Sequence, residues 1–284
     1  MAVKWPKALV TEIAERRVVL FIGAGLSKAA VPDLPSWPDL LSALVQNVGA
    51  KKDQELVRRL VRNGRLLDAA ELINSVTIAA DRRAYLQGIF LRNPTPHSDL
   101  YKNLLDLDCK VCITTNYDQL IEKNFEHFSG AQAAYQVRTY KYRNFLADLR
   151  SPGRTILKLH GCITEPEGVI LDRQSFFKAK TENPGMYDAV AALSTVNTVL
   201  FLGYSINDPD IQLILEGVHA RSATDHTHFA LVSRFEHPSL RNALSATYNV
   251  TFVEYPMGAH GEVPKAIAEL RNLVKETRAA VGIP

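Results

Sequence analysis

The fold is decided by the stretch Val18-Val19-Leu20-Phe21-Ile22-Gly23-Ala24-Gly25-Leu26-Ser27. It opens with five apolar residues, four of them β-branched or aromatic, a pattern typical of a strand buried on both faces. Gly23 and Gly25 allow a tight turn after that strand, and Ser27 offers a hydroxyl where a helix can begin. This arrangement binds phosphate when free N–H groups and the helix dipole face the anion. An ordinary tight strand-to-helix turn has the same pattern, so the turn alone leaves both interpretations open.

Strand and helix patterns alternate through much of the remaining chain. Helices are expected at 8–17 and 264–280, and further helices are expected to start near Asp118 and Asp208. Apolar strands are expected at 110–114, 155–159, 198–202, 228–232 and 250–254. Because strands alternate with helices, we expect an α/β fold with a mostly parallel sheet and helices on both faces.

A helical module is expected between about residues 50 and 107, where apolar residues recur at helical spacing without a strand pattern. We interpret it as an insert within a single domain spanning residues 1–284. Before it, three prolines over 31–38 indicate an extended loop anchored by Trp37, followed by a helix from Asp39. The arginines of the module fall mostly between its apolar positions, which favours a solvated face over a nucleic-acid patch.

The bulk composition indicates a soluble globular protein of 284 residues, with 46% hydrophobic and 22% charged residues. No apolar run approaches the roughly 20 residues that a membrane span needs. The first 17 residues mix charges with Trp5 and Pro6 and lack the apolar stretch of a signal peptide. A cytoplasmic location follows as the default, and a net charge of +3 is too small to indicate nucleic-acid binding.

The three cysteines do not form a disulfide framework or a recognisable metal site. Cys109 and Cys112 form a C-x-x-C within an expected strand, where positions three apart point to opposite faces. No second such pair follows to complete a zinc site. We therefore expect buried, reduced thiols and no bound metal.

Polar or glycine-rich residues follow four of the expected strands directly. In a parallel sheet, ligands bind outside the carboxyl ends of the strands, so these residues are expected to converge on one crevice. The four segments are Gly23-Ala24-Gly25-Leu26-Ser27, Thr114-Thr115-Asn116-Tyr117-Asp118, Lys158-Leu159-His160-Gly161 and Gly203-Tyr204-Ser205-Ile206-Asn207-Asp208.

A dinucleotide-dependent dehydrogenase fits this pattern poorly. Lys28 stands where the third glycine of G-x-G-x-x-G belongs. A strand ending in an acid is also expected about twenty residues further on. The proline loop and a helix occupy that segment instead.

Taken in order and spacing, five motifs resemble those of sirtuin-type NAD-consuming domains, from residue 18 to about 233. The resemblance implies a Rossmann-like sheet with NAD in the crevice. The motifs are Gly23-Ala24-Gly25-Leu26-Ser27, Val31-Pro32-Asp33, Thr115-Asn116-Tyr117-Asp118, Leu159-His160-Gly161 and Gly203-Tyr204-Ser205.

More narrowly, Pro35-Ser36-Trp37, Thr114–Asp118 and Gly203–Ser205 with Asp208 resemble the bacterial sirtuin-like branch of antiphage defence systems. That branch implies cleavage of NAD to nicotinamide and ADP-ribose. Sirtuin deacylases carry a four-cysteine zinc module after the His-Gly motif, whereas Cys162 is the only cysteine after it here. This departure favours NAD hydrolysis over protein deacylation.

The catalytic residues implied by the resemblance are His160 and Asn116. A histidine with an ordinary pKa of about 6.5 suits proton uptake at neutral pH. The Asn116 amide can donate and accept, so it can hold a ribose hydroxyl or a water, or it can simply cap a helix. Asp118 can orient Asn116 or bind the ribose, or it can complement the dipole of the helix it begins.

The remaining expected binding residues are assigned by position along NAD. Gly23, Ala24, Gly25 and Ser27 are expected to cradle the diphosphate, and Asp33 lies on the loop expected to cover the nicotinamide. The adenosine half is expected to meet Gly203 and Ser205, with Ser233 near the adenine ribose. Thr115 and Tyr204, in the same motifs, complete the set. Asp208 is expected to cap a helix, and His97 to be structural.

Two other functions remain open on the sequence: an NAD-dependent protein deacylase, and a non-catalytic nucleotide-sensing or assembly module. The resemblance also implies that the protein acts as a homo-oligomer or with a partner defence protein, such as an ATPase, a helicase or an Argonaute-like protein. No membrane and no direct nucleic-acid partner is expected.

Overall fold

A computed structural model describes residues 3–129, 135–205 and 227–283, and its sheet is entirely parallel over these residues. The strand order is β3-β4-β2-β1-β5-β6-β7. The strands are β1 (Val18–Ile22), β2 (Val111–Thr114), β3 (Tyr135–Thr139), β4 (Arg154–Lys158), β5 (Thr198–Leu202), β6 (His228–Ser233) and β7 (Val250–Tyr255). The expected helix at Asp208 lies outside the described residues.

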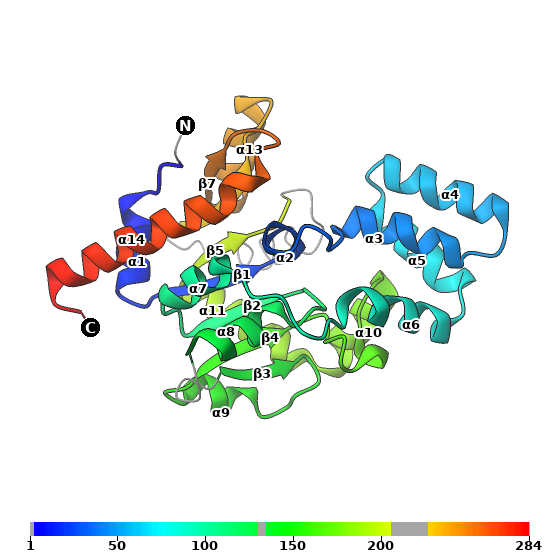
Figure 1. The fold of residues 1–284 in the computed structure, drawn as a ribbon, viewed down its shortest axis with the longest axis horizontal. Coiled ribbons are helices and arrows are strands. Elements are labelled where there is room, and N and C mark those ends of the chain that lie inside the picture. The colour runs from blue at the N-terminus through cyan, green and yellow to red at the C-terminus, as the bar shows by residue number, and fades with distance from the viewer. Residues whose placement is uncertain (1–2, 130–134, 206–226, 284) are drawn as a thin grey trace.

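The expected α/β class with helices on both faces is confirmed (Figure 1). Alternate residues of β1 enter different cores, as the strand period requires. Leu20 packs on the face covered by α1, α7, α8 and α14, and Phe21 packs on the face covered by α10 and α11. The five residues of β1 are all buried, as its apolar run predicts.

The helices have these bounds: α1 (Lys7–Ala14), α2 (Ala24–Ala30), α3 (Trp37–Leu44), α4 (Lys51–Arg62), α5 (Leu66–Val76), α6 (Ala79–Phe90), α7 (Asp99–Asp106), α8 (Leu120–Ser129), α9 (Phe145–Arg150), α10 (Arg173–Glu182), α11 (Pro184–Val196), α13 (Pro238–Tyr248) and α14 (Val263–Val281). Short 3-10 turns occur at η1 (Val45–Asn47), η3 (Pro166–Gly168) and η4 (His260–Glu262). None of the helices in the described ranges is long and apolar enough to cross a membrane.

Helices α4, α5 and α6 stand to one side of the sheet, together with α3 (Figure 1). Helix α3 packs against α4 and α5, and α5 contacts α10, which belongs to the sheet body. Helix α7 packs instead on α8 and α14, beside the sheet. The helices that follow the first strand therefore divide between an outlying group and the sheet layer.

Two helix starts differ from the sequence expectation. Helix α2 begins at Ala24, so Ser27 lies inside it and its hydroxyl faces the core instead of capping the end. Helix α3 begins at Trp37 and not at Asp39, because Ser36 and Asp39 form a capping box around it. Proline is tolerated in the first turn of a helix, where its missing N–H is not needed, so Pro38 does not exclude this start.

The C-x-x-C pair also differs from its expected geometry. Strand β2 begins only at Val111, and Asp108 has a positive φ of 57°, so the chain bends before Cys109 reaches the strand. Cys109 and Cys112 therefore lie in the same apolar core and not on opposite faces. Burial raises the pKa of the Cys109 thiol to about 12 and also raises that of Cys112. Within the described ranges, no three His, Cys, Asp or Glu side chains are grouped to hold a metal.

Candidate functional site

The carboxyl ends of four strands lie level with one another at the centre of the sheet. Ile22 of β1 pairs in register with Thr114 of β2 and with Leu202 of β5, and Thr114 pairs with Lys158 of β4. The strand order also reverses at β1, because the chain proceeds to β2 on one side and later to β5 on the other. A crevice at such a switch point is where parallel α/β sheets bind ligands.

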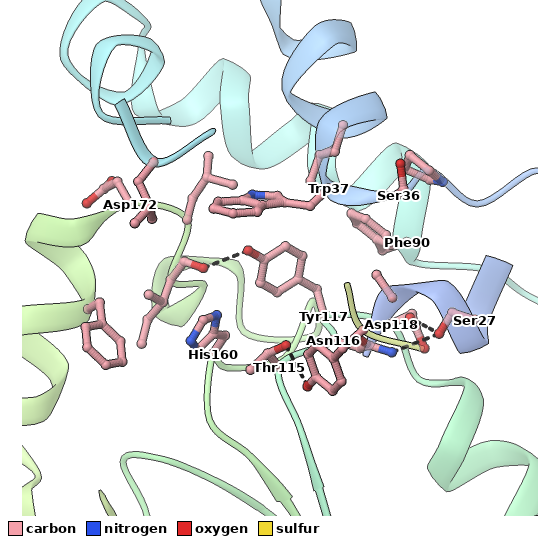
Figure 2. Close-up of a pocket in the computed structure, with 18 of the residues that line it drawn as sticks. Ser27, Ser36, Trp37, Phe90, Thr115, Asn116, Tyr117, Asp118, His160 and Asp172 are labelled. Atoms are coloured by element: carbon pink, nitrogen blue, oxygen red, sulfur yellow. Dashed lines mark hydrogen bonds between the residues drawn. The ribbon is translucent and has the colours of Figure 1, made fainter. Parts of the chain in front are cut away.

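A cavity of about 310 Å³ occupies this position (Figure 2). All four strand-end segments contribute to it, together with the loop before α3 and the segment that leads into α10. Its floor is polar apart from Ala24 and is formed by Ala24, Ser27, Thr115, Asn116, Asp118, His160 and Tyr204.

The glycine turn after β1 packs against the loop after β5. The N–H groups of Gly23 and Gly25 donate to the carbonyls of Leu202 and Gly203, each at 2.8 Å. A Cβ on Gly25 would lie 2.7 Å from the Gly203 oxygen, and Gly203 itself has a φ of +76° that favours glycine. The glycines are thus required by the close approach of two loops, and these two N–H groups already have protein partners.

A buried hydrogen-bond network centres on Ser27, which joins α2 to the loop after β2 (Figure 2). The Ser27 hydroxyl donates to Asp118 Oδ2 at 2.9 Å and accepts from Asn116 Nδ2 at 3.0 Å. Since its one proton is used, the Tyr101 hydroxyl at 3.2 Å must be a donor. Three partners saturate the Ser27 oxygen, and Asp118 Oδ1 accepts from the Leu120 N–H at 2.9 Å.

Asn116 is held in one orientation by these contacts. Its backbone N–H donates to Thr114 Oγ1 at 3.0 Å, and its side-chain nitrogen is bound to Ser27. Its Oδ1, in contrast, is buried and has no hydrogen-bond partner in the structure. Buried polar atoms without a partner are rare, so this oxygen is a candidate ligand-binding atom in the cavity wall.

Thr115 and Tyr204 connect the loops after β2 and β5. The Tyr204 hydroxyl donates to the Ile22 carbonyl at 2.9 Å and therefore accepts from Thr115 Oγ1 at 3.1 Å. The Thr114 hydroxyl donates to the same Ile22 carbonyl at 2.6 Å. Both contacts fix the relative positions of the strand-end loops.

His160 lies at the carboxyl end of β4 with 7% of its surface exposed. The following Gly161 has a φ of +80°, and the His160 carbonyl accepts from the Ile170 N–H at 3.0 Å. The imidazole ring of His160 packs edge to face against the Phe176 ring, with the two ring centroids 6.0 Å apart. His160 and Asn116 both line the cavity, as their positions at strand ends predicted.

An aromatic wall faces the polar floor, and sequence reasoning found only part of it. Trp37 and Phe90 lie on the opposite side of the cavity from Asn116 and His160 (Figure 2). The cavity is also lined by Phe176 and Phe177 of α10 and by the buried Asp172. These three were not predicted from the sequence as site residues. Asp172 accepts from the Ser175 N–H at 2.7 Å, and this helix-capping pattern, Asp-Arg-Gln-Ser, was the available signal.

Several expected binding residues do not line the cavity that the described part of the chain forms. Asp33 is exposed and does not line it, whereas Leu34, Pro35 and Ser36 of the same loop do. The described residues that line the cavity also do not include five other expected ones: Gly23, Gly25, Gly203, Ser205 and Ser233. The cavity therefore brings together Ala24, Ser27, Thr115, Asn116, Asp118, His160 and Tyr204 from the expected set.

The parallel sheet, with a polar crevice at the carboxyl ends of its central strands, places this chain in the Rossmann-like class of α/β proteins. A model of the SIR2-like domain family matches residues 110–253, about half of the chain. The chain therefore belongs to the SIR2-like domain family, and the resemblance found in its motifs is confirmed.

Curated relatives cover most of this chain at modest identity. The NAD(+) hydrolase ThsA of Acinetobacter baumannii is 26% identical over 253 residues, covering 85% of this chain and 48% of the relative. The protein of the same name from Bacillus cereus is 26% identical and covers 81% and 46%. Defense-associated sirtuin 2 of Bacillus subtilis is 24% identical and covers 71% and 19%. The chain thus spans about half the length of these two ThsA proteins and about a fifth of the length of the Bacillus subtilis protein.

A solved structure of similar fold is the complex of a Sir2 homologue S24A mutant with ADP-ribose. It aligns with a TM-score of 0.50 at 12% identity, over 97% of this chain and 98% of that chain. At this identity the likeness concerns the fold.

Proposed function

We propose that this protein binds NAD in the strand-end cavity and hydrolyses it to nicotinamide and ADP-ribose. The observation that carries the proposal is that Asn116, whose buried Oδ1 has no hydrogen-bond partner, lines the same cavity as His160. The names of the ThsA relatives, which call them NAD(+) hydrolases, support the same reaction. The proposal concerns this chain, which covers about half of those relatives.

The reaction breaks the bond between the nicotinamide nitrogen and C1 of its ribose. The bonding electrons leave with nicotinamide, which departs neutral, and positive charge develops on the sugar as in glycoside hydrolysis. A water oxygen then bonds to C1 and releases one proton. The products are nicotinamide, ADP-ribose and that proton, and no general acid is needed because the leaving group starts as a cation.

We assign Asn116 to the nicotinamide ribose. Its Oδ1 can accept from a ribose hydroxyl or from the attacking water, while Ser27 holds the other end of the amide. Ser27 and Asp118 are then positioning residues, because the Ser27 oxygen is already saturated. This assignment moves Ser27 away from the diphosphate role that the sequence suggested.

His160 is proposed to accept the proton released by the attacking water, directly or through a ribose hydroxyl. The aromatic wall of Trp37, Phe90 and Phe176 provides a dry surface for the flat nicotinamide ring. Such a wall excludes bulk water from the developing cation. We assign the polar floor to the ribose and the aromatic wall to the base.

The diphosphate and adenosine assignments stay proposals. Ala24 lines the cavity and is placed to meet the diphosphate, with Gly23 and Gly25 shaping the turn. Thr115 and Tyr204 are proposed to border the bound nucleotide. The adenosine half is proposed to contact Gly203, Ser205 and Ser233. Asp33 is proposed to belong to the loop that covers the nicotinamide. Residues 1–284 are proposed to act as one NAD-binding domain with a helical insert at about 50–107.

A role in bacterial antiphage defence is also proposed, since one relative is named a defence-associated sirtuin. An enzyme that depletes NAD must be controlled, which favours action as a homo-oligomer or with a partner defence protein. Sedimentation of the purified protein, and capture of co-purifying proteins from its natural host, test these two forms of control.

The hydrolysis is tested by incubating the purified protein with NAD and measuring nicotinamide and ADP-ribose. Wild type is expected to release both in equal amounts, and Asn116→Ala and His160→Ala are expected to lose at least about a hundredfold in kcat. Asn242→Ala and His237→Ala, on the exposed surface around α13, are matched controls expected to keep the wild-type rate.

Three results would contradict the proposal. Binding of NAD without release of nicotinamide, even with a co-purifying partner present, would favour a sensing or assembly module. Release that requires an acylated peptide and yields O-acyl-ADP-ribose would favour a deacylase. Full activity in Asn116→Ala would show that the site is misassigned.

A further inference from the structure

A buried ion pair, Lys158 with Glu122, contacts the backbone of Asp118, a residue that lines the cavity. Lys158 is the last residue of β4, and its side chain is wholly inaccessible to solvent. Its Nζ donates to Glu122 Oε1, in the first turn of α8, at 2.9 Å and also to the backbone carbonyl of Asp118. Burial lowers the pKa of Lys158, but the charge of Glu122 opposes it and the net direction is upward. Lys158 is therefore an ammonium ion with two protein partners.

A contribution to the stability of the fold does not by itself explain why a charged pair occupies these two buried positions. Removing two charges from water costs about as much as their attraction returns, and apolar replacements of similar size are often neutral or stabilising. The pair is also incompletely satisfied, because Glu122 Oε2 is buried without a hydrogen-bond partner. The contact of Lys158 that an apolar side chain could not replace is the hydrogen bond to the Asp118 carbonyl.

The contacts of Lys158 connect the two catalytic segments. The Asp118 carbonyl lies two residues after Asn116, on the loop whose side chains also reach Ser27. His160 lies two residues after Lys158 on the other segment. Lys158 is also the register partner of Thr114, whose hydroxyl holds the Asn116 N–H. One ammonium group thus ties the loop that carries Asn116 to the end of the strand that leads into His160.

We infer that Lys158 is a positioning residue for NAD cleavage, which sets the Asn116 loop relative to His160 through its contact with the Asp118 carbonyl. Glu122 keeps the ammonium group in place. The inference rests on the proposed function. A displacement of about 1 Å of a catalytic group can cost roughly a hundredfold in rate, so an anchor of this kind acts on kcat.

The test replaces the whole pair, in the double variant Lys158→Met/Glu122→Leu, so that no charge is left buried alone. We expect the thermal midpoint to fall by only a few degrees, because the apolar pair packs well and the one loss is the hydrogen bond to the Asp118 carbonyl. We expect kcat for NAD to fall roughly tenfold to a hundredfold with KM changed less than about threefold. Amide hydrogen exchange at residues 115–120 is expected to quicken. A matched control removes the exposed Lys265–Glu262 pair, also at 2.9 Å, through Lys265→Ala, and is expected to change none of these values.

The outcomes separate the inference from the proposed function. Wild-type kcat or unchanged exchange at 115–120 in the double variant overturns the inference and leaves NAD hydrolysis standing. Failure of the double variant to fold also overturns it, because the pair would then be required for the core. If wild type does not cleave NAD, the proposed function fails, and quickened exchange still supports the anchoring of the loop by Lys158.

Discussion

The side-chain nitrogen of Asn116 donates to the Ser27 hydroxyl at 3.0 Å, across a sequence separation of 89 residues. Because this bond engages the nitrogen, Asn116 Oδ1 is the side-chain atom that has no hydrogen-bond partner, and it is the atom that we propose binds the ribose or the water. The orientation of the amide is therefore set by α2 and not by its own loop. The glycine turn and the Asn116 loop act together through this contact.

Ser27→Ala should release Asn116 while keeping the backbone of α2. The variant leaves the Asn116 nitrogen and the Tyr101 hydroxyl buried without this partner, which costs about 1–3 kcal/mol of unfolding free energy. We expect kcat for NAD to fall about tenfold or more because the amide can rotate. Urea unfolding and nicotinamide release measure both effects. Ser42→Ala, on the exposed side of α3, is the control, and an unchanged kcat in Ser27→Ala would refute the positioning role.

Gly25→Ala should disrupt the contact between the loops after β1 and β5. The added Cβ would lie 2.7 Å from the Gly203 oxygen, and the obstructing atom is backbone that cannot rotate away. Overpacking of this kind costs about 1–3 kcal/mol. We expect a lower thermal midpoint and weaker NAD binding, measured by calorimetry.

Gly88→Ala supplies the opposite control for that substitution. Gly88 lies within α6, and a Cβ there would meet no atom within 4 Å. Alanine in an exposed helix position is favoured over glycine by about 0.5–1 kcal/mol, so stability should rise. Equal destabilisation by both variants would contradict the loop-contact explanation.

The sequence could predict the polar floor of the site because its residues follow apolar strands directly. The patterns at Ile22, Thr114 and Leu202 mark strand ends, and parallel pairing then brings the next residues together. For this reason the sequence predicted six of the seven strands in the described residues, β1 among them, to within one residue at each end. Strand β3 was missed, because all of its residues are only half buried and its pattern is weak.

The aromatic wall could not be predicted in the same way. Phe90 and Phe176 are 86 positions apart, and both reach the cavity only through the way the outlying helices, α6 among them, pack against the sheet body that carries α10. Ser27 was expected to cap a helix, and only the tertiary contact with Asp118 shows its buried role. Local patterns do not contain such contacts.

Asp68→Asn should loosen the contact between α5 and α10 at the cavity. Asp68 binds Arg65 at 2.6 Å within its own helix group and Arg173 at 2.5 Å on α10, and Arg173 lines the cavity. Exposed ion pairs contribute about 0–1 kcal/mol, so global stability should hardly change. We expect KM for NAD to rise with salt in wild type and to be higher and less salt-dependent in Asp68→Asn.

The pH behaviour of that contact follows from the same pair. Arg173 and then Arg65 hold the pKa of the Asp68 carboxyl below its ordinary range, so the charged contact is present above about pH 3.9. It is lost only as pH falls through the lowered pKa, and the salt effect should be constant between about pH 6 and 8. Glu55→Gln on α4 is the control, and a salt response in Asp68→Asn equal to that of wild type would contradict the prediction.

The buried thiols should resist alkylation in the native protein and become reactive on unfolding. Burial raises the pKa of Cys109 to about 12 and also raises that of Cys112, so little reactive thiolate exists near pH 8. Because the thiol pKa is higher in the folded protein than in the unfolded chain, the protonated thiols contribute to the free energy of unfolding. This contribution is complete below the thiol pKa of the unfolded chain, about 8.5, and is lost progressively as pH rises toward 12. Iodoacetamide labelling followed by mass spectrometry, with and without urea, measures the reactivity, and urea midpoints at about pH 8 and pH 10 measure the stability. Ser42→Cys provides an exposed thiol as a positive control. Native labelling of Cys109 as fast as that control, or a midpoint that rises with pH, would contradict the assigned burial.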